Sequence, residues 1–216
     1  MIDVPTPATI EDLVTGLNIF SRAEIPSEKK SAMIVDYFKL YKNNDWQKFA
    51  FWDDFRYTRN LIEEIDGCYS LILMCWPEGS ASRIHDHPNA DCIMACLDGK
   101  IKYRIITSIK FELTSRETQL NWPEADDNKP VILSKETFAV SGEVLHMNDS
   151  MGIHRVENAS SSDRAATLHF YFPCIHECLI FAEDSGRSTK VKMCYHSIKG
   201  VKQAPQNISR GAQCIS

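Results

Sequence analysis

The feature that most constrains the fold is a change in the pattern of apolar and turn-forming residues at about residue 67. From there to about residue 200 the chain consists of short runs rich in Ile, Val, Leu, Tyr and Phe, separated by turn signals such as Pro77-Glu78-Gly79 and Ser141-Gly142. Such runs are typical of an antiparallel β-sandwich or barrel. The Asp98-Gly99 pair also favours a tight hairpin that joins residues 91–97 to residues 100–106.

Residues 1–55 have a helical pattern instead. Thr9 can cap a first helix, with Asp12 three positions further on. Ser27 can cap a second helix, which carries apolar residues at helical spacing: Ile34, Tyr37, Phe38 and Tyr41. A short third helix can follow Asp45. We therefore expect one mainly β domain over residues 1–216, with short N-terminal α-helices (1–55), a β-barrel (67–200) that carries a polar surface excursion at 114–130, and a C-terminal tail (201–216).

Composition excludes several classes of protein. With 216 residues, of which 44% are hydrophobic, the chain can bury one substantial core. Its net charge of -5, without a basic cluster, predicts no nucleic-acid partner. No segment approaches the roughly 18 apolar residues of a membrane span, so no membrane partner is expected. Eight cysteines, in a chain that starts without a signal-peptide pattern, predict reduced thiols and a cytoplasmic location.

A first motif points to metal. His85 and His87 stand two positions apart, so in a strand both side chains face the same way and can ligate one ion. Together with Gly79, Cys92 and Gly99 they give the spacing Gly-x5-His-x-His-x4-Cys-x6-Gly. This spacing resembles the first cupin motif, in which a glutamate normally occupies the position that Cys92 holds here.

A second motif supplies a third histidine. His154 and Asn158 form a His-x3-Asn pattern that resembles the second cupin motif, although Gly152 lies one position away from the usual glycine. Three neutral imidazoles leave a divalent ion its full charge of +2, which favours a soft, anionic ligand. A six-coordinate ion would keep three further positions, enough for a thiolate, an amine and O2.

Five segments, in the same order, resemble eukaryotic cysteine dioxygenase over about residues 46–196: RYTRNL (56–61), MCW (74–76), IHDH (84–87), NDS (148–150) and HRVEN (154–158). The resemblance implies a cupin-type jelly roll and one Fe(II) per chain, bound by His85, His87 and His154. It also implies a monomeric enzyme that oxidises free L-cysteine with O2 to cysteine sulfinic acid, a step of cysteine catabolism that supplies taurine and sulfate.

The same resemblance implies roles for further residues. Arg59, assisted by Tyr57, would bind the substrate carboxylate, as a planar guanidinium can do with two hydrogen bonds. Cys92 and Tyr171 would be joined by a thioether, and His169 would orient the Tyr171 hydroxyl. Other residues would shape the pocket: Thr167, Trp76, Met193 and Cys178. Family members commonly have serine at the position of Thr167, and the longer interval between the two motifs is a second departure.

Three alternatives remain open. The enzyme could act on another small thiol such as mercaptopropionate or cysteamine, although Arg59 favours a carboxylated substrate. Three histidines and a water molecule also describe a zinc hydrolase, and a catalytically silent cupin would only bind a ligand.

Other cysteines and histidines carry no recognisable metal motif. Neither Cys92-x3-Cys96 nor Cys174-x3-Cys178 has the spacing of a structural zinc site. The remaining histidines are expected to be structural: His146, His176 and His196.

Overall fold

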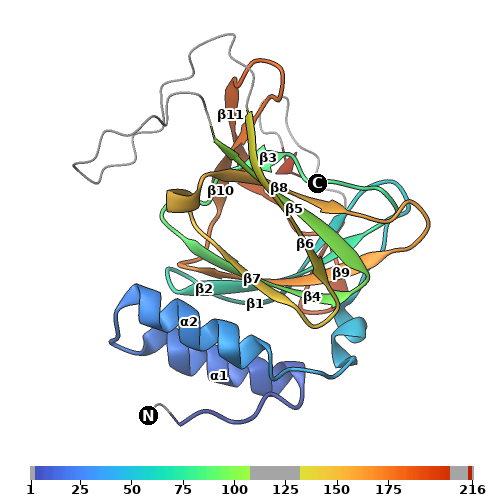
Figure 1. The fold of residues 1–216 in the computed structure, drawn as a ribbon. Coiled ribbons are helices and arrows are strands. Elements are labelled where there is room, and N and C mark those ends of the chain that lie inside the picture. The colour runs from blue at the N-terminus through green and yellow to red at the C-terminus, as the bar shows by residue number, and fades with distance from the viewer. Residues whose placement is uncertain (1–2, 108–131, 205–213, 216) are drawn as a thin grey trace.

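Two sheets enclose a barrel, and two helices pack outside one of them (Figure 1). The computed structural model describes residues 3–107, 132–204 and 214–215. The helical elements are α1 (Ile10–Arg22), α2 (Ser27–Phe38) and the 3-10 helices η1 (Asp45–Phe49) and η2 (Asp149–Met151). The expected polar excursion at residues 114–130 lies outside the described residues.

Each sheet has seven strands within the described residues. The first has the order β13-β12-β1-β2-β9-β4-β7. Its strands are β1 (Thr58–Ile65), β2 (Tyr69–Trp76), β4 (Asp91–Asp98), β7 (Val144–Met147), β9 (Ala165–Phe172), β12 (Ser197–Ile198) and β13 (Val201–Lys202). The second has the order β14-β11-β10-β3-β8-β5-β6. Its strands are β3 (Ile84–His85), β5 (Lys100–Thr107), β6 (Ile132–Val140), β8 (Ile153–Asn158), β10 (Glu177–Phe181), β11 (Ser188–Met193) and β14 (Cys214–Ile215).

The helices begin largely where the sequence predicts. Thr9 and Asp12 form a capping box at the start of α1, with the Thr9 hydroxyl accepting from the Asp12 N–H at 3.1 Å. The prediction that Ser27 caps α2 is wrong. Pro26 holds the cap position, and Ser27 is already helical and donates its hydroxyl to Asp91 at 3.2 Å. Proline suits a helix start because its φ is fixed and it has no N–H to satisfy.

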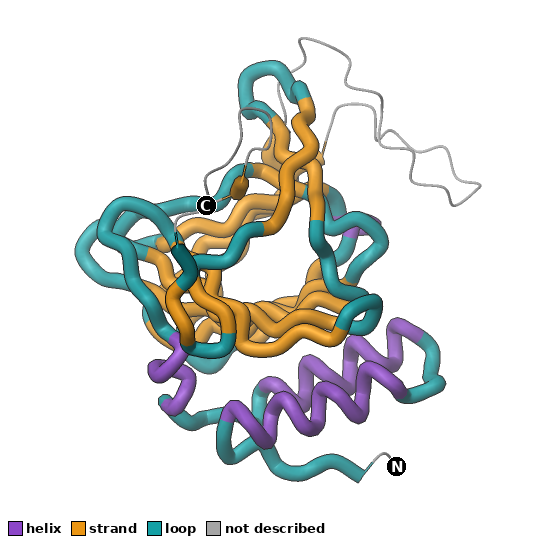
Figure 2. Tube along the Cα trace, turned by 180° about the vertical axis from the view of Figure 1, so that it is seen from behind, coloured by secondary structure: helices purple, strands orange, loops and turns teal. Residues whose placement is uncertain are grey.

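Two cores lie on opposite faces of the first sheet. In β2, Leu71, Leu73 and Cys75 pack toward the helices, whereas Ile72 and Met74 point into the barrel. All eight residues of this strand are therefore buried, because a strand sends alternate side chains to opposite faces. The reverse view shows the helices on the outer side of the barrel, so they leave its interior to the strands (Figure 2). That interior is where the site lies.

The predicted hairpin between residues 91–97 and 100–106 is wrong. β4 pairs with β9 and β7, whereas β5 pairs with β8 and β6, so the chain passes from one sheet to the other at Gly99. Gly99 has a φ of 75°, and a Cβ there would lie 2.7 Å from the Arg164 carbonyl oxygen. Glycine is thus required by a corner between sheets, which resembles a hairpin turn locally but leads to different partner strands.

The cysteines differ partly from expectation. Six are free thiols in the part of the chain that the structure describes: Cys68, Cys75, Cys92, Cys96, Cys174 and Cys178. Cys194, however, is disulfide-bonded, so the prediction that all thiols are reduced is wrong at this position. Among the described helices, none has both the length and the apolar character needed to cross a membrane.

Candidate metal centre

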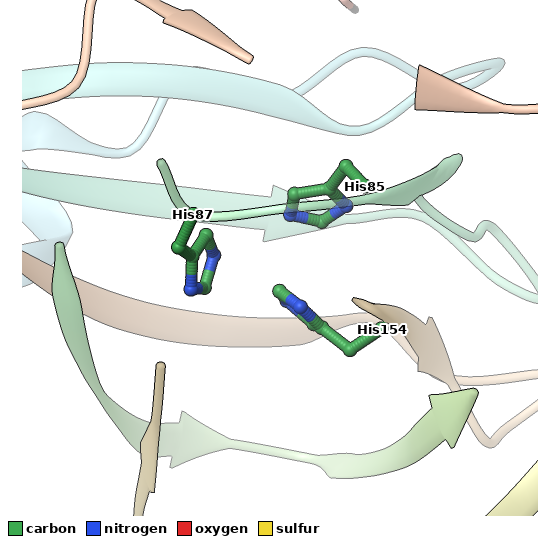
Figure 3. A group of neighbouring side chains, drawn as sticks. All are labelled: His85, His87 and His154. Atoms are coloured by element: carbon green, nitrogen blue, oxygen red, sulfur yellow. The ribbon is translucent and has the colours of Figure 1, made fainter. Parts of the chain in front are cut away.

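Three buried histidines meet inside the barrel (Figure 3). His85 ends β3 and pairs directly with His154 of β8, and His87 follows two residues after His85. The ring centroid of His154 lies 4.2 Å from that of His85 and 4.4 Å from that of His87. Each ring offers a nitrogen, and these nitrogens lie within 4.8 Å of one another. The structure thus brings together the three predicted ligands.

The hydrogen bonding of these rings fits a metal ion. His85 Nδ1 lies 2.8 Å from the Arg83 carbonyl oxygen, which requires the proton on Nδ1 and leaves Nε2 with a lone pair. Both ring nitrogens of His87, and Nδ1 of His154, are buried without a hydrogen-bond partner among the described residues. Burying such atoms is costly unless a ligand satisfies them. A divalent cation would bind one nitrogen of each ring.

Burial also keeps the three imidazoles neutral. It lowers the pKa of His85 to about 4 and the pKa of both His87 and His154 well below the ordinary value. A neutral imidazole has the lone pair that a metal needs. The ligand set is therefore ready for an ion at neutral pH.

These lowered pKa values predict an acid-sensitive metal-free protein. The unfolded chain takes up protons below about pH 6.5, whereas folded His85 resists them down to about pH 4. The free energy of unfolding should consequently fall as the pH falls through this window. Urea denaturation of metal-free protein at several pH values measures the slope. In His85→Gln the slope should be shallower, and an unchanged slope would contradict the neutral state of this ring. Asp86, whose pKa is raised and acts in the opposite sense, titrates in both proteins and cancels.

Two aspartate side chains fix the segment that carries His85 and His87 by accepting hydrogen bonds from backbone N–H groups. Asp149 accepts a hydrogen bond from the His87 N–H at 2.6 Å, and Asp86 accepts one from the Leu179 N–H at 2.8 Å. Asp149 belongs to the NDS segment (148–150), whose resemblance to the family implies no role for it. Its partner lies 62 positions away, so nothing local in the sequence indicates this contact.

A polar array lies on the inner face of β9, where alternate side chains of the strand face the barrel. The Trp76 indole N–H donates to Thr167 at 2.8 Å, and the Thr167 hydroxyl lies 2.8 Å from His169 Nε2. A Thr167 hydroxyl that donates its own proton to Nε2 places the proton of neutral His169 on Nδ1. Burial lowers the pKa of His169 to about 3, which is consistent with this neutral form.

Tyr171 ends this array next to the histidines. Its hydroxyl oxygen lies 3.4 Å from His169 Nδ1, and its ring centroid lies 5.3 Å from that of His87. The hydroxyl of Tyr171, with its single proton, also forms a side-chain hydrogen bond with Cys92. Burial raises the pKa of Tyr171 well above its ordinary value, so this proton is held at neutral pH.

Cys92 and Tyr171 are direct neighbours across two strands. Their Cα atoms are partners in the β4–β9 register, and both residues are buried. Partners of this kind have Cβ atoms about 5 Å apart. Cys92 Sγ also lies 3.9 Å from His169 Nδ1. The structure thus brings together both members of the predicted thioether.

Arg59 is a barrel residue and not a surface residue. Its side chain on β1 is 4% exposed, and its guanidinium carbon lies 5.5 Å from the ring centroid of Tyr57. Tyr57 in turn stacks on Trp76 at 4.8 Å. Burial is the main cause of both pKa shifts, but the positive charge of Arg59 adds to the lowered pKa of His169 and opposes the raised pKa of Tyr171. The guanidinium therefore lies in electrostatic range of the array.

The two remaining predicted pocket residues come from β10 and β11. Cys178 is buried in the inner core, and Met193 is partly buried against it. Burial raises the pKa of the Cys178 thiol to about 12, while Arg59 opposes this shift. A small cavity of about 10 Å³ lies beside the histidines, with apolar walls that include Met94 and Met147. Such walls exclude bulk water from the site.

Two facing sheets that hold three inward histidines define a metal-binding protein of the cupin class.

Comparison with known proteins specifies the family. A model of the family "Cysteine dioxygenase type I" matches residues 1–184. The chain belongs to this cysteine dioxygenase family. It is 33% identical to cysteine dioxygenase type 1 of Rattus norvegicus over 199 residues, covering 91% of this chain and 90% of the rat protein. It is 33% identical to the Homo sapiens protein over 203 residues, covering 93% and 92%.

Solved structures with a similar fold are more distant. One, from Thermus thermophilus, has 15% sequence identity and a TM-score of 0.45, and covers 62% of this chain and 99% of that chain. An RmlC-like cupin protein from Desulfovibrio desulfuricans has 16% identity and a TM-score of 0.37, and covers 58% and 91%.

Proposed function

We propose that this chain is a cysteine dioxygenase that converts free L-cysteine and O2 to cysteine sulfinic acid. The observation that carries the proposal is a set of three buried, neutral histidines inside the same barrel as a buried arginine; among the residues that the structure describes, no carboxylate belongs to this set. His85, His87 and His154 would hold one Fe(II), and iron supplies the redox chemistry that joins O2 to sulfur. Cysteine itself supplies the electrons, so no reducing cosubstrate is needed.

The chain's own residues would bind and orient the amino acid. The planar guanidinium of Arg59 would donate hydrogen bonds to the substrate carboxylate. Tyr57 stacks between this arginine and Trp76. The neutral ligand set preserves the +2 charge of the ion, which favours the thiolate form of the substrate. Tyr171, with its proton held by burial and its oxygen engaged by His169, would donate a hydrogen bond to the bound reactants. Positioning of this kind is the protein's main contribution.

Anaerobic reconstitution tests the proposal. Metal-free protein is loaded with Fe(II), exposed to cysteine and O2, and assayed at the same time for oxygen uptake and sulfinate formation. We expect one O2 consumed for each sulfinate formed. Oxygen uptake without sulfinate would contradict the reaction. Zinc in place of iron in the purified protein, found by metal analysis, would favour the hydrolase. Cysteamine and mercaptopropionate in the same assay test the alternative substrates.

We further propose a monomeric, cytoplasmic enzyme with one iron ion per chain. Size-exclusion chromatography measures the oligomeric state, and metal analysis measures the iron content. We expect a single species of one chain with one iron ion.

We also propose the thioether between Cys92 and Tyr171. An S–H and a ring C–H bond break, an S–C bond forms, and two protons and two electrons pass to O2. Mass spectrometry of peptides from protein incubated with iron, cysteine and O2 should show a linked pair that has lost two hydrogens. Cys92→Ser should abolish the linked pair, whereas Cys96→Ser, at another buried cysteine of the same strand, should retain it. Linkage in Cys92→Ser would contradict this assignment.

A further inference from the structure

A second group of metal-ligating side chains lies away from the histidine centre. Asp66 is in the turn between β1 and β2, and Cys174 and His176 are in the connection from β9 to β10. Asp66 and His176 are exposed, whereas Cys174 is half-buried. Ile175, between them, is buried in the barrel core. Its inward direction leaves the Cys174 and His176 side chains to meet on the outside.

The distances within this group match those of metal ligands. Cys174 Sγ lies 3.6 Å from His176 Nε2, which lies 3.3 Å from Asp66 Oδ1. A tetrahedral ion about 2.3 Å from sulfur and about 2.0 Å from nitrogen and oxygen holds the sulfur–nitrogen pair about 3.5 Å apart and the nitrogen–oxygen pair about 3.3 Å apart. All three ligand atoms lie within 4.8 Å of one another. The sulfur–oxygen pair of such an ion would be about 3.5 Å apart, and the Asp66 carboxylate is exposed and can rotate to meet this distance.

We propose that Asp66, Cys174 and His176 form a second metal site, which takes a zinc-like divalent cation with water in the remaining position. A thiolate, an imidazole and a carboxylate are the donors that Zn2+ uses in proteins. A plain surface ion pair between Asp66 and His176 would account for two of the three groups, but it gives no reason for a thiol at ligand distance from the same imidazole nitrogen.

The electrostatic surroundings favour a cation at this site. Burial, and then the charges of Glu64 and Asp66, raise the pKa of the Cys174 thiol, although backbone N–H groups of Gly67 and Cys68 act in the opposite sense. The same negative charges that favour the protonated Cys174 thiol also stabilise a divalent cation that replaces this proton on sulfur. Metal binding would therefore release the thiol proton.

The two segments are held in place before an ion binds. The Cys68 N–H donates to the Ile65 carbonyl at 2.9 Å and closes the turn that carries Asp66. The Met193 N–H donates to the His176 carbonyl at 2.8 Å and ties the second segment to β11. An ion would join segments that lie 110 positions apart in the sequence, so it would add a crosslink between β1–β2 and β9–β10.

Cobalt titration of the iron-loaded enzyme tests this proposal. Co2+ bound to a thiolate has a near-ultraviolet charge-transfer absorption, which a centre of three histidines lacks. We expect the absorption to saturate at one Co2+ per chain and to disappear when Zn2+ displaces the cobalt. Cys174→Ser should abolish it, and His176→Gln should weaken Co2+ binding at least tenfold.

Matched variants separate this site from its alternatives. Cys178→Ser and His146→Gln should keep the full absorption, and so should His154→Ala, because its altered centre contributes no thiolate. No absorption in the parent enzyme, or absorption that persists in Cys174→Ser, would overturn the site. Loss of the absorption in Cys178→Ser would overturn it too, because the ligands would then be the Cys174-x3-Cys178 pair.

Discussion

Replacing His154 with alanine is expected to remove iron from the enzyme and to lower kcat/KM for cysteine by at least about 100-fold. His154 is central to the group of rings: its ring centroid lies 4.2 Å from that of His85 and 4.4 Å from that of His87. Changes in residues that merely support a ligand already cost about 10- to 100-fold, so loss of the ligand itself should cost at least as much. Metal analysis and the sulfinate assay measure both effects.

His146→Ala is the matched control for this loss. His146 lies on β7 and contacts Asp91, with 2.5 Å between its Nε2 and the Asp91 Oδ1. It is a partly exposed histidine that points away from the three rings. This variant should keep its iron and its activity, and circular dichroism should show that both variants are folded. Full iron content in His154→Ala would rule out this histidine as a ligand.

Replacing Arg59 with alanine is expected to raise the KM for cysteine by about 100-fold. A hydrogen bond to a charged group contributes about 1.5–3 kcal/mol, and about 1.4 kcal/mol corresponds to a factor of ten in affinity. Cysteamine, which has no carboxylate, should lose far less, so the preference for cysteine over cysteamine should shrink. Arg59→Lys keeps the charge without the planar fork and should give an intermediate KM.

Arg56 provides the control for the arginine experiment. It lies three positions from Arg59, is exposed, and pairs with Asp53 at 3.5 Å. Arg56→Ala should leave the KM for both thiols unchanged. Steady-state kinetics of the two variants with both substrates gives the comparison. An unchanged KM for cysteine in Arg59→Ala would refute the carboxylate contact and reopen the choice of substrate.

The polar array explains how one strand can serve both a core and a site. In β9, Leu168 and Phe170 pack toward the helices, whereas Thr167, His169 and Tyr171 face the barrel. The Thr167 hydroxyl accepts from Trp76 and reaches His169. Thr167 therefore links Trp76 to His169 in one hydrogen-bonded chain.

Local signals predicted much of the fold correctly. The capping box of Thr9 and Asp12 is formed by residues three positions apart, so a local pattern determines the backbone at the start of α1 directly. The hairpin at Gly99 was wrong because a turn residue reports the backbone at one point and does not select the strand that will pair next. Partner strands are chosen by burial on both faces, to which distant residues contribute.

The sequence alone determined the chemistry available to this protein: the two histidine motifs, Cys92 where a cupin carries glutamate, and an arginine suited to a carboxylate. Only the tertiary structure decided that His85 and His154 are cross-strand partners, that Arg59 is buried in the barrel, and that Asp66 lies beside Cys174 and His176. The physical reason is one of range. Residue type and periodicity act over a few positions, whereas a site is made by segments that distant strand pairing brings together.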